Sequence, residues 1–310
     1  MKKIPVIIDT DPGVDDFLAL TLANTSDKLD IRGICAVGGN QILEKTAQNA
    51  LDIAKLIGLD VPVAKGAEKA LNMPMENAGH VHGDSGIGNV VLEKSTKEFD
   101  KRYAWDMMYD EARLNEGELE IIAVGPLTNV AIALLKYPDI HKYIKRIVLM
   151  GGSATIGNRM PYSEFNIWGD PLAADIVFKS GIKIVMVGLN ATHQTMLSEE
   201  EIEEIKKIPS RLSKEIGSLL DSMLEVYRGF GHKGPVIHDA LAVAYVMNED
   251  VLSCKDYYVA IETRSRLNYG RTVVDIDNSH RDKAKNASVA MGVDVDLFKK
   301  MIKDMVAYYN

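Results

Sequence analysis

The sequence predicts an α/β fold: an open, mostly parallel, doubly wound sheet with a helical insertion and extra strands near the C-terminus. Two observations lead to this prediction. Short, nearly continuous runs of β-branched and other apolar residues recur along the chain, as in strands buried on both faces of a parallel sheet. Helical stretches alternate with these runs, and this βα alternation is typical of doubly wound sheets.

The expected elements follow one another without a Pro- or Ser-rich linker, so residues 1–310 are predicted to form a single domain. Buried strands are expected at 4–8, 31–37, 120–124, 146–150 and 183–187, and helices near 42–57, 127–136 and 170–179. Residues 198–235 form the predicted helical insertion over the active site. Late strands at 257–261, 271–275 and 287–291 and a helix at 295–308 close the chain.

Composition and charge indicate a globular protein and argue against nucleic-acid and membrane partners. Of the 310 residues, 46% are hydrophobic and 26% charged, as in an ordinary globular protein. The net charge is −8 without a basic stripe, so no nucleic-acid partner is expected. No apolar run is long enough for a membrane span, so no membrane partner is expected. The chain has two cysteines and therefore no disulfide framework, which favours a cytoplasmic location.

Four carboxylates crowd into the segment that follows the first predicted strand. This segment reads Asp-Thr-Asp-Pro-Gly-Val-Asp-Asp and contains Asp9, Asp11, Asp15 and Asp16. Like charges this close must stay protonated, point apart or share a cation. A cage of oxygen atoms suits a hard cation, Ca²⁺ or Mg²⁺. Capping of the next helix by Asp15 or Asp16 explains one or two acids but not four, so the segment predicts a metal site.

Further polar residues follow other strands, where open α/β sheets bind their ligands. Each segment alone can be explained as a turn, a helix cap or a core histidine. Together they place Asn, Asp, Glu and His side chains where one crevice can collect them. The segments are Gly-Gly-Asn ending at Asn40, Gly-Pro-Leu-Thr-Asn from Gly125, Met-Gly-Gly from Met150, Glu-Phe-Asn from Glu164, and His-Asp from His238.

With these segments in order from residue 6 to about 245, and with His-Gly-Asp at His82, the chain resembles the inosine–uridine-preferring nucleoside hydrolases. The acidic octapeptide is highly specific to that family. The resemblance implies an α/β core, one bound Ca²⁺, and hydrolysis of the N-glycosidic bond of purine or pyrimidine ribonucleosides to ribose and free base. It also implies a role in nucleoside salvage, a ribonucleoside as the small-molecule partner, and a homo-oligomer, either a dimer or a tetramer.

The resemblance assigns the metal ligands residue by residue. Asp11, Asp16 and Asp239 match calcium ligands, and the backbone carbonyl of Thr128 matches a fourth. Asp11 is also expected to be the general base that takes a proton from the attacking water. Asp9 is expected behind these residues, where it would orient the loop.

The resemblance also implies how the ribose is held. The matching positions are Asp15 and Asn40 for the 2′-hydroxyl, Asn166 for the 3′-hydroxyl, Asn158 and Glu164 for the 5′-hydroxyl, and Met150 beneath the sugar. Carboxylates around the ring are expected to stabilise the positive charge of an oxocarbenium-like transition state.

On the base side, the resemblance points to His238 and His82. The leaving base departs as an anion unless it is protonated, and an imidazole is suited to supply that proton, so His238 is the candidate acid. The segment 223–233 is expected to form a mobile wall over the base, with Tyr227 and Phe230 as contacts. Alternatively, these two aromatic residues, three positions apart, are the core stripe of a helix.

Two other functions compete with this interpretation. A phosphatase of the haloacid-dehalogenase type also carries an Asp-x-Asp pair after its first strand, with Mg²⁺; Asp9 would then be the nucleophile and Asp11 the acid. The Pro-Gly-x-Asp-Asp continuation and the Glu-Phe-Asn segment do not fit that pattern. A non-catalytic nucleoside-binding protein is the second alternative. Asp11 argues against it, because binding alone has little need of a base.

Overall fold

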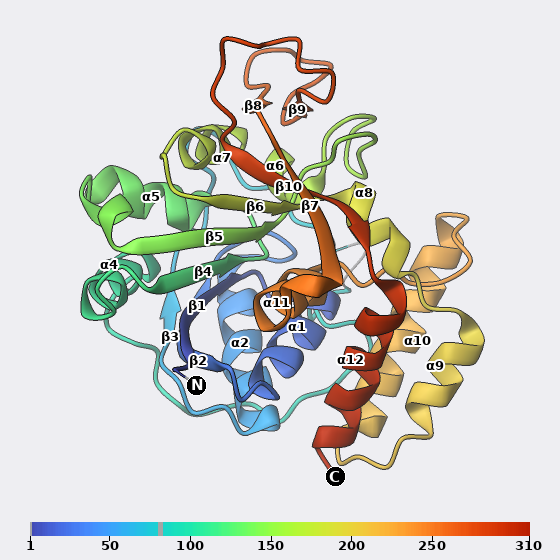
Figure 1. Ribbon diagram of the computed structural model, residues 1–310. Coiled ribbons are helices and arrows are strands. Elements are labelled where there is room, and N and C mark those ends of the chain that lie inside the picture. The colour runs from blue at the N-terminus through green and yellow to red at the C-terminus, as the bar shows by residue number, and fades with distance from the viewer. Residues whose placement is uncertain (1, 80–82) are drawn as a thin grey trace.

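An eight-stranded sheet runs through the centre of the computed structural model, which describes residues 2–79 and 83–310 (Figure 1). Neighbouring strands are parallel except for the last pair, which is antiparallel, and this confirms the predicted fold class. In spatial order the strands are β3 (Val63–Lys65), β2 (Leu29–Ala36), β1 (Ile4–Thr10), β4 (Leu119–Ala123), β5 (Ile144–Met150), β6 (Ile184–Val187), β10 (Ala287–Val293) and β7 (Leu252–Tyr257). A separate antiparallel pair joins β8 (Val259–Ile261) to β9 (Thr272–Val274).

Helices cover both faces of the sheet, which explains why the central strands are apolar throughout. In β1, Val6 and Ile8 belong to one buried cluster and Ile7 to the other, because successive side chains point to opposite faces. The first face is covered by α1 (Val14–Asn24), α2 (Leu43–Ile57), α11 (Asp239–Met247) and α12 (Val295–Tyr308). The second is covered by α4 (Ala104–Leu114), α5 (Thr128–Lys136) and α7 (Pro171–Phe178).

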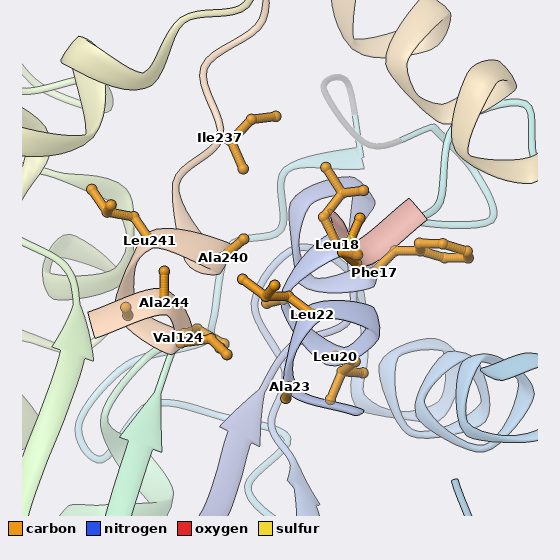
Figure 2. Packing of buried hydrophobic residues seen from close by; sticks show 14 of the residues in the cluster. Phe17, Leu18, Leu20, Leu22, Ala23, Val124, Ile237, Ala240, Leu241 and Ala244 are labelled. Atoms are coloured by element: carbon orange, nitrogen blue, oxygen red, sulfur yellow. The ribbon is translucent and has the colours of Figure 1, made fainter. Parts of the chain in front are cut away.

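Helices α1 and α11 pack directly against each other although they lie far apart in the sequence. Figure 2 shows Leu22 of α1 reaching toward Ala240 and Ala244 of α11, in a part of the core whose residues are almost fully buried. The small alanine side chains allow this close approach. The packing brings the first turns of both helices together, and each of these turns carries acidic residues.

The strand order reverses between β1 and β4. From β1 the chain moves outward to β2 and β3, and it then returns to build β4, β5 and β6 on the other side. The ends of β1 and β4 lie side by side, with Asp9 paired in register with Ala123. The loops that follow these two strands leave the sheet in opposite directions, and doubly wound sheets bind their ligands in the crevice between such loops.

The structure also corrects the predicted elements. The helical insertion consists of two helices, α9 (Glu199–Lys206) and α10 (Ser213–Gly229). The strand predicted at 257–261 is wrong as one element, because Tyr257 ends β7 in the main sheet and β8 belongs to the small sheet. Strand β3 and helix α4 were not expected from the sequence pattern. Within the described ranges, no helix is long and apolar enough to cross a membrane.

Candidate active site

Three buried carboxylates converge where α1 and α11 begin. One oxygen each from Asp15, Asp16 and Asp239 lies within 4.8 Å of the others. Burial, followed by the charge of Asp15, raises the pKa of Asp239 well above its usual range. Burial and the charge of Asp16 likewise raise the pKa of Asp15. A divalent cation would relieve this repulsion and reverse these shifts.

Asp11 lies next to this cluster in a slot between two glycines. Its Oδ2 accepts the backbone N–H of Asn40 at 2.6 Å. Its Oδ1 is buried and has no hydrogen-bond partner among the described residues. A Cβ atom at Gly39 would lie 2.1 Å from Oδ2 of Asp11, and one at Gly125 would lie 2.6 Å from Oδ1, so only glycine fits at either position. The slot thus holds a carboxylate with one oxygen left for a cation or a proton.

Asp16 is both a helix cap and a member of the cluster. Its Oδ2 accepts the backbone N–H of Gly13 at 2.8 Å, which caps α1, and also the side-chain amide of Asn40 at 3.0 Å. Its Oδ1 accepts the hydroxyl of Thr10. Asp16 can therefore cap α1 and also belong to the predicted metal site.

Asp9 lies behind the cluster and is completely buried. Its Oδ1 accepts the side-chain amide of Asn129 at 2.7 Å. The same amide donates to the carbonyl of Ala36 at 3.2 Å, and Oδ1 of Asn129 accepts the backbone N–H of Ala67 at 2.8 Å. Asp9 thus belongs to a network that joins the ends of β1 and β2, whereas a phosphatase nucleophile has to reach its substrate.

Thr128 is fully buried as the first residue of α5. Its hydroxyl donates to Oδ2 of Asp170 at 2.8 Å, and the same oxygen accepts the backbone N–H of Leu71 at 2.8 Å. The second oxygen of Asp170 caps α7. The hydroxyl of Thr128 therefore holds Asp170 in place and supports the fold. The assignment of the Thr128 carbonyl as a metal ligand stays a prediction.

A cavity of about 750 Å³ opens beside the carboxylates. Asp11, Asp16 and Thr128 do not line it, and His82 lies outside the described residues. Ten other predicted site residues line it: Asp15, Asn40, Met150, Asn158, Glu164, Asn166, Tyr227, Phe230, His238 and Asp239. The structure therefore brings the predicted sugar-side and base-side residues to one chamber.

Two amide side chains that line this chamber, Asn40 and Asn166, have both of their N–H groups engaged by the protein. The Nδ2 group of Asn40 donates to the carbonyl of Asp11 at 3.1 Å and to Asp16 at 3.0 Å. The Nδ2 group of Asn166 donates to the carbonyls of Val124 and Met150 at 2.9 and 3.1 Å. Because these acceptors use both N–H bonds of each amide, Oδ1 is the group left for a ligand, and it suits a hydroxyl that donates.

Glu164 caps the short helix α6 (Phe165–Gly169) and lines the same chamber. Its two oxygens accept three backbone N–H groups, those of Gly152, Asn166 and Ile167. Burial nevertheless outweighs these bonds and raises the pKa of Glu164 to about 7. Asn158 is held by the backbone N–H of Phe165, which donates to its Oδ1 at 2.9 Å.

On the base side, His238 is held at both ring nitrogens. Nδ1 lies 2.8 Å from the hydroxyl of Thr192, and Nε2 lies 2.8 Å from the hydroxyl of Tyr227. Burial, with the charge of Asp15, raises the pKa of Tyr227, so this hydroxyl stays protonated. Phe230 is 59% exposed at the end of α10, which shows that the core-stripe interpretation is wrong for this residue.

His232, within the segment 223–233 expected to cover the base, also lines the chamber, whereas four residues that line or support it were missed by the sequence analysis: Thr192, His193, Glu76 and Arg159. The ring centroids of His193 and His238 lie 5.9 Å apart, and those of His193 and His232 lie 6.2 Å apart. Burial lowers the pKa of His193, so its imidazole is neutral at pH 7. Thr192 and His193 follow β6 closely, so the rule that ligands bind beyond strand ends could have found them.

Comparison with known proteins agrees with this geometry. Residues 6–300 match the model of the family described as inosine-uridine preferring nucleoside hydrolase. The chain is 40% identical over 309 residues to a pyrimidine-specific ribonucleoside hydrolase RihA of Shewanella sp. (strain MR-7), covering 99% of this chain and 97% of the relative. It is 37% identical to the protein of the same name from Escherichia coli O1:K1 / APEC, over 99% of both chains.

Solved structures show the same architecture. A purine-preferring ribonucleoside hydrolase from Gardnerella vaginalis superposes with a TM-score of 0.91 at 33% identity, covering 98% of this chain and 99% of the other. An inosine-guanosine nucleoside hydrolase gives a TM-score of 0.90 at 27% identity, covering 99% of both chains. The match extends over nearly the whole chain in sequence and in structure, and the chain therefore belongs to the inosine-uridine preferring nucleoside hydrolase family.

Proposed function

We propose that the protein is a Ca²⁺-dependent hydrolase that cleaves the N-glycosidic bond of ribonucleosides to give ribose and free base, for nucleoside salvage. The observation that carries this proposal is the convergence of buried carboxylates at the point where the strand order reverses, beside a chamber of about 750 Å³ lined by amides, carboxylates and imidazoles. A chamber of this size suits a small molecule.

The residues present fit a hard divalent cation. The donor set consists only of oxygens, the carboxylates repel one another, and Asp11 has a buried oxygen without a partner in the described structure. Asp11, Asp16, Asp239 and the carbonyl of Thr128 would hold Ca²⁺. When bound, the ion would lower the pKa of a water molecule and orient the ribose diol.

The protein's own groups supply the remaining steps. Oδ1 of Asp11 accepts the proton of the attacking water. Asp15 accepts the single hydrogen bond that the 2′-hydroxyl donates, with Oδ1 of Asn40 beside it, and Oδ1 of Asn166 accepts one from the 3′-hydroxyl. These oxygens also surround the anomeric carbon with negative potential, which favours a transition state with positive charge on the ring.

The leaving base receives its proton from the pair formed by His238 and Tyr227. The two side chains are 2.8 Å apart and both line the chamber, so the phenol O–H of Tyr227 gives its proton to the base and a doubly protonated His238 replaces that proton from Nε2. Thr192 holds the far side of the ring and thereby fixes its orientation.

We also propose that pyrimidine ribonucleosides are the better substrates, because full-length relatives at 37–40% identity are named pyrimidine-specific. The protein named purine-preferring is 33% identical. A cytoplasmic location is consistent with two free cysteines, Cys35 and Cys254. The single domain and the homo-oligomer stay predictions.

The experiment is a screen of uridine, cytidine, inosine and guanosine for release of free base, after chelation and after return of Ca²⁺ or Mg²⁺. We expect Ca²⁺ to restore hydrolysis of ribonucleosides, and we expect uridine and cytidine to release free base faster than inosine and guanosine. Phosphate release from phosphate esters would instead indicate the phosphatase alternative. Tight binding of nucleosides without any product would indicate a binding protein.

A further inference from the structure

An ion pair joins two loops at the chamber wall. Glu76 lies in the loop that precedes residue 80, and Arg159 directly follows Asn158. Oε2 of Glu76 lies 2.6 Å from a terminal nitrogen of Arg159, and both residues line the chamber. Among the described residues, Arg159 has no other carboxylate partner. Because the side chains are 55% and 35% exposed, the pair contributes little to stability, and its position at the chamber is the feature to explain.

The guanidinium of Arg159 is also fixed in place by an aromatic ring. It lies 4.1 Å from the centroid of Trp168, which is buried in α6. A planar guanidinium stacks well on such a ring, and its N–H groups remain free to bind an anion at its edge. Loss of Glu76 would therefore leave a cation held at the chamber wall.

This cation lies on the side assigned to the 5′-hydroxyl. Asn158 is its neighbour in sequence, and Glu164 lines the same chamber. Because the pKa of Glu164 is raised to about 7, this carboxyl is only partly ionised at neutral pH and repels a phosphate incompletely. Glu76 is exposed at the same wall and supplies a second negative charge.

We propose that Glu76, by pairing with Arg159, sets the selectivity of the enzyme against 5′-phosphorylated nucleosides. The proposal rests on the proposed function, since it takes the ribose to lie with its 5′ end toward Asn158. A 5′-phosphate would have to displace Glu76 from Arg159 and remain beside the displaced carboxylate. Without Glu76, the same phosphate would find a guanidinium that is already positioned and unpaired.

The test compares kcat/KM for uridine 5′-monophosphate with kcat/KM for uridine in the Ca²⁺-loaded enzyme. We expect Glu76→Gln to raise this ratio by about tenfold, because solvent keeps the interaction between partly exposed charges small. Arg159→Gln in the same chain should cancel the gain. Glu93→Gln, which removes an acid paired with Lys55, is the matched control and should leave the ratio unchanged.

A second measurement does not depend on turnover. Ribose 5-phosphate should inhibit the Glu76→Gln variant at lower concentration than the wild type, and added salt should weaken the effect. A ratio within twofold of the wild type for Glu76→Gln, or a gain that persists in the double variant, would overturn the inference. An enzyme that cleaves no nucleoside at all would instead contradict the proposed function.

Discussion

The two sides of the chamber are built in different ways. The sugar side is formed by residues just beyond strand ends, and Asp15, Asn40 and Asn166 are all at most 9% exposed. The side predicted to face the base combines the buried His238 with the end of α10, where Phe230 is 59% exposed. The difference indicates that the residues predicted to hold the sugar lie on buried elements, whereas part of the wall predicted to face the base lies where substitution disturbs little else.

The largest effect is expected from the sugar side. Asp11→Asn keeps the shape of the side chain but removes the charge and the proton acceptor. Turnover should fall by at least about 10⁴-fold for every ribonucleoside, and chelation should have a comparable effect. Asp60→Asn, at an exposed pair with Lys97, is the control. Full activity of Asp11→Asn, or of chelated enzyme, would contradict the mechanism.

The next effect concerns the 2′-hydroxyl. Deoxyuridine lacks the hydroxyl that would donate to the buried Asp15 and coordinate the cation, at about 2 kcal/mol for each lost interaction, so kcat/KM should fall by about 10³-fold relative to uridine. The same comparison with inosine and deoxyinosine shows whether the loss in kcat/KM depends on the sugar alone or also on the base. Similar values for the ribo and deoxy substrates would show that this side does not bind ribose as proposed.

A pH experiment tests the sugar side in a different way. The pKa of Glu164 is about 7 in the folded protein and about 4.5 in an unfolded chain, so the folded state binds the additional proton between these values. The free energy of unfolding should therefore fall as pH rises from 4.5 to 7, and Glu164 should contribute about 3 kcal/mol of this fall. Denaturation of Glu164→Gln across this range should show a smaller decline, whereas Glu93→Gln should match the wild type. An equal fall in the free energy of unfolding in all three proteins would show that the pKa of Glu164 is not raised.

The smallest effect is expected on the base side. His238→Ala should slow uridine hydrolysis by about 10²-fold, because the base then departs without a proton. A nitrophenyl riboside has a good leaving group and should lose less than about threefold. Equal losses with both substrates would mean that His238 supports the site structurally and does not supply the proton.

The contrast between the two sides also explains how much could be predicted from the sequence. The apolar strands that alternate with helical stretches are local signals that predicted the fold class, and the acids after the strand around Ile7 are a local signal that predicted the place of the site. Phe230 and Tyr227 gave an ambiguous signal, because three-residue spacing fits a core stripe as well as a pocket. The pair of Glu76 and Arg159 gave none, since the two residues belong to different loops that only the tertiary structure brings together.

Missed elements have equally specific causes. Strand β3 has three residues and follows Pro62, so its pattern is too short to recognise. Helix α4 mixes Trp, Met, Tyr and charged residues, and its buried face became evident only against the sheet. Strand β7 lies at the edge of the sheet and carries Lys255 and Asp256, which lower its apolar character.

Asp11 and Asp239 are separated by 228 positions in the sequence (239 − 11), and the packing of α11 on α1 brings them together. A nascent chain leaving the ribosome carries the acidic loop long before it carries the residue that completes the cluster. The residues of the carboxylate cluster are thus complete only after the chain has been synthesised through β6, α9 and α10 to the first residue of α11. A chain that ends before α11 would therefore contain the acidic signature of the family but lack Asp239, the carboxylate that completes the cluster.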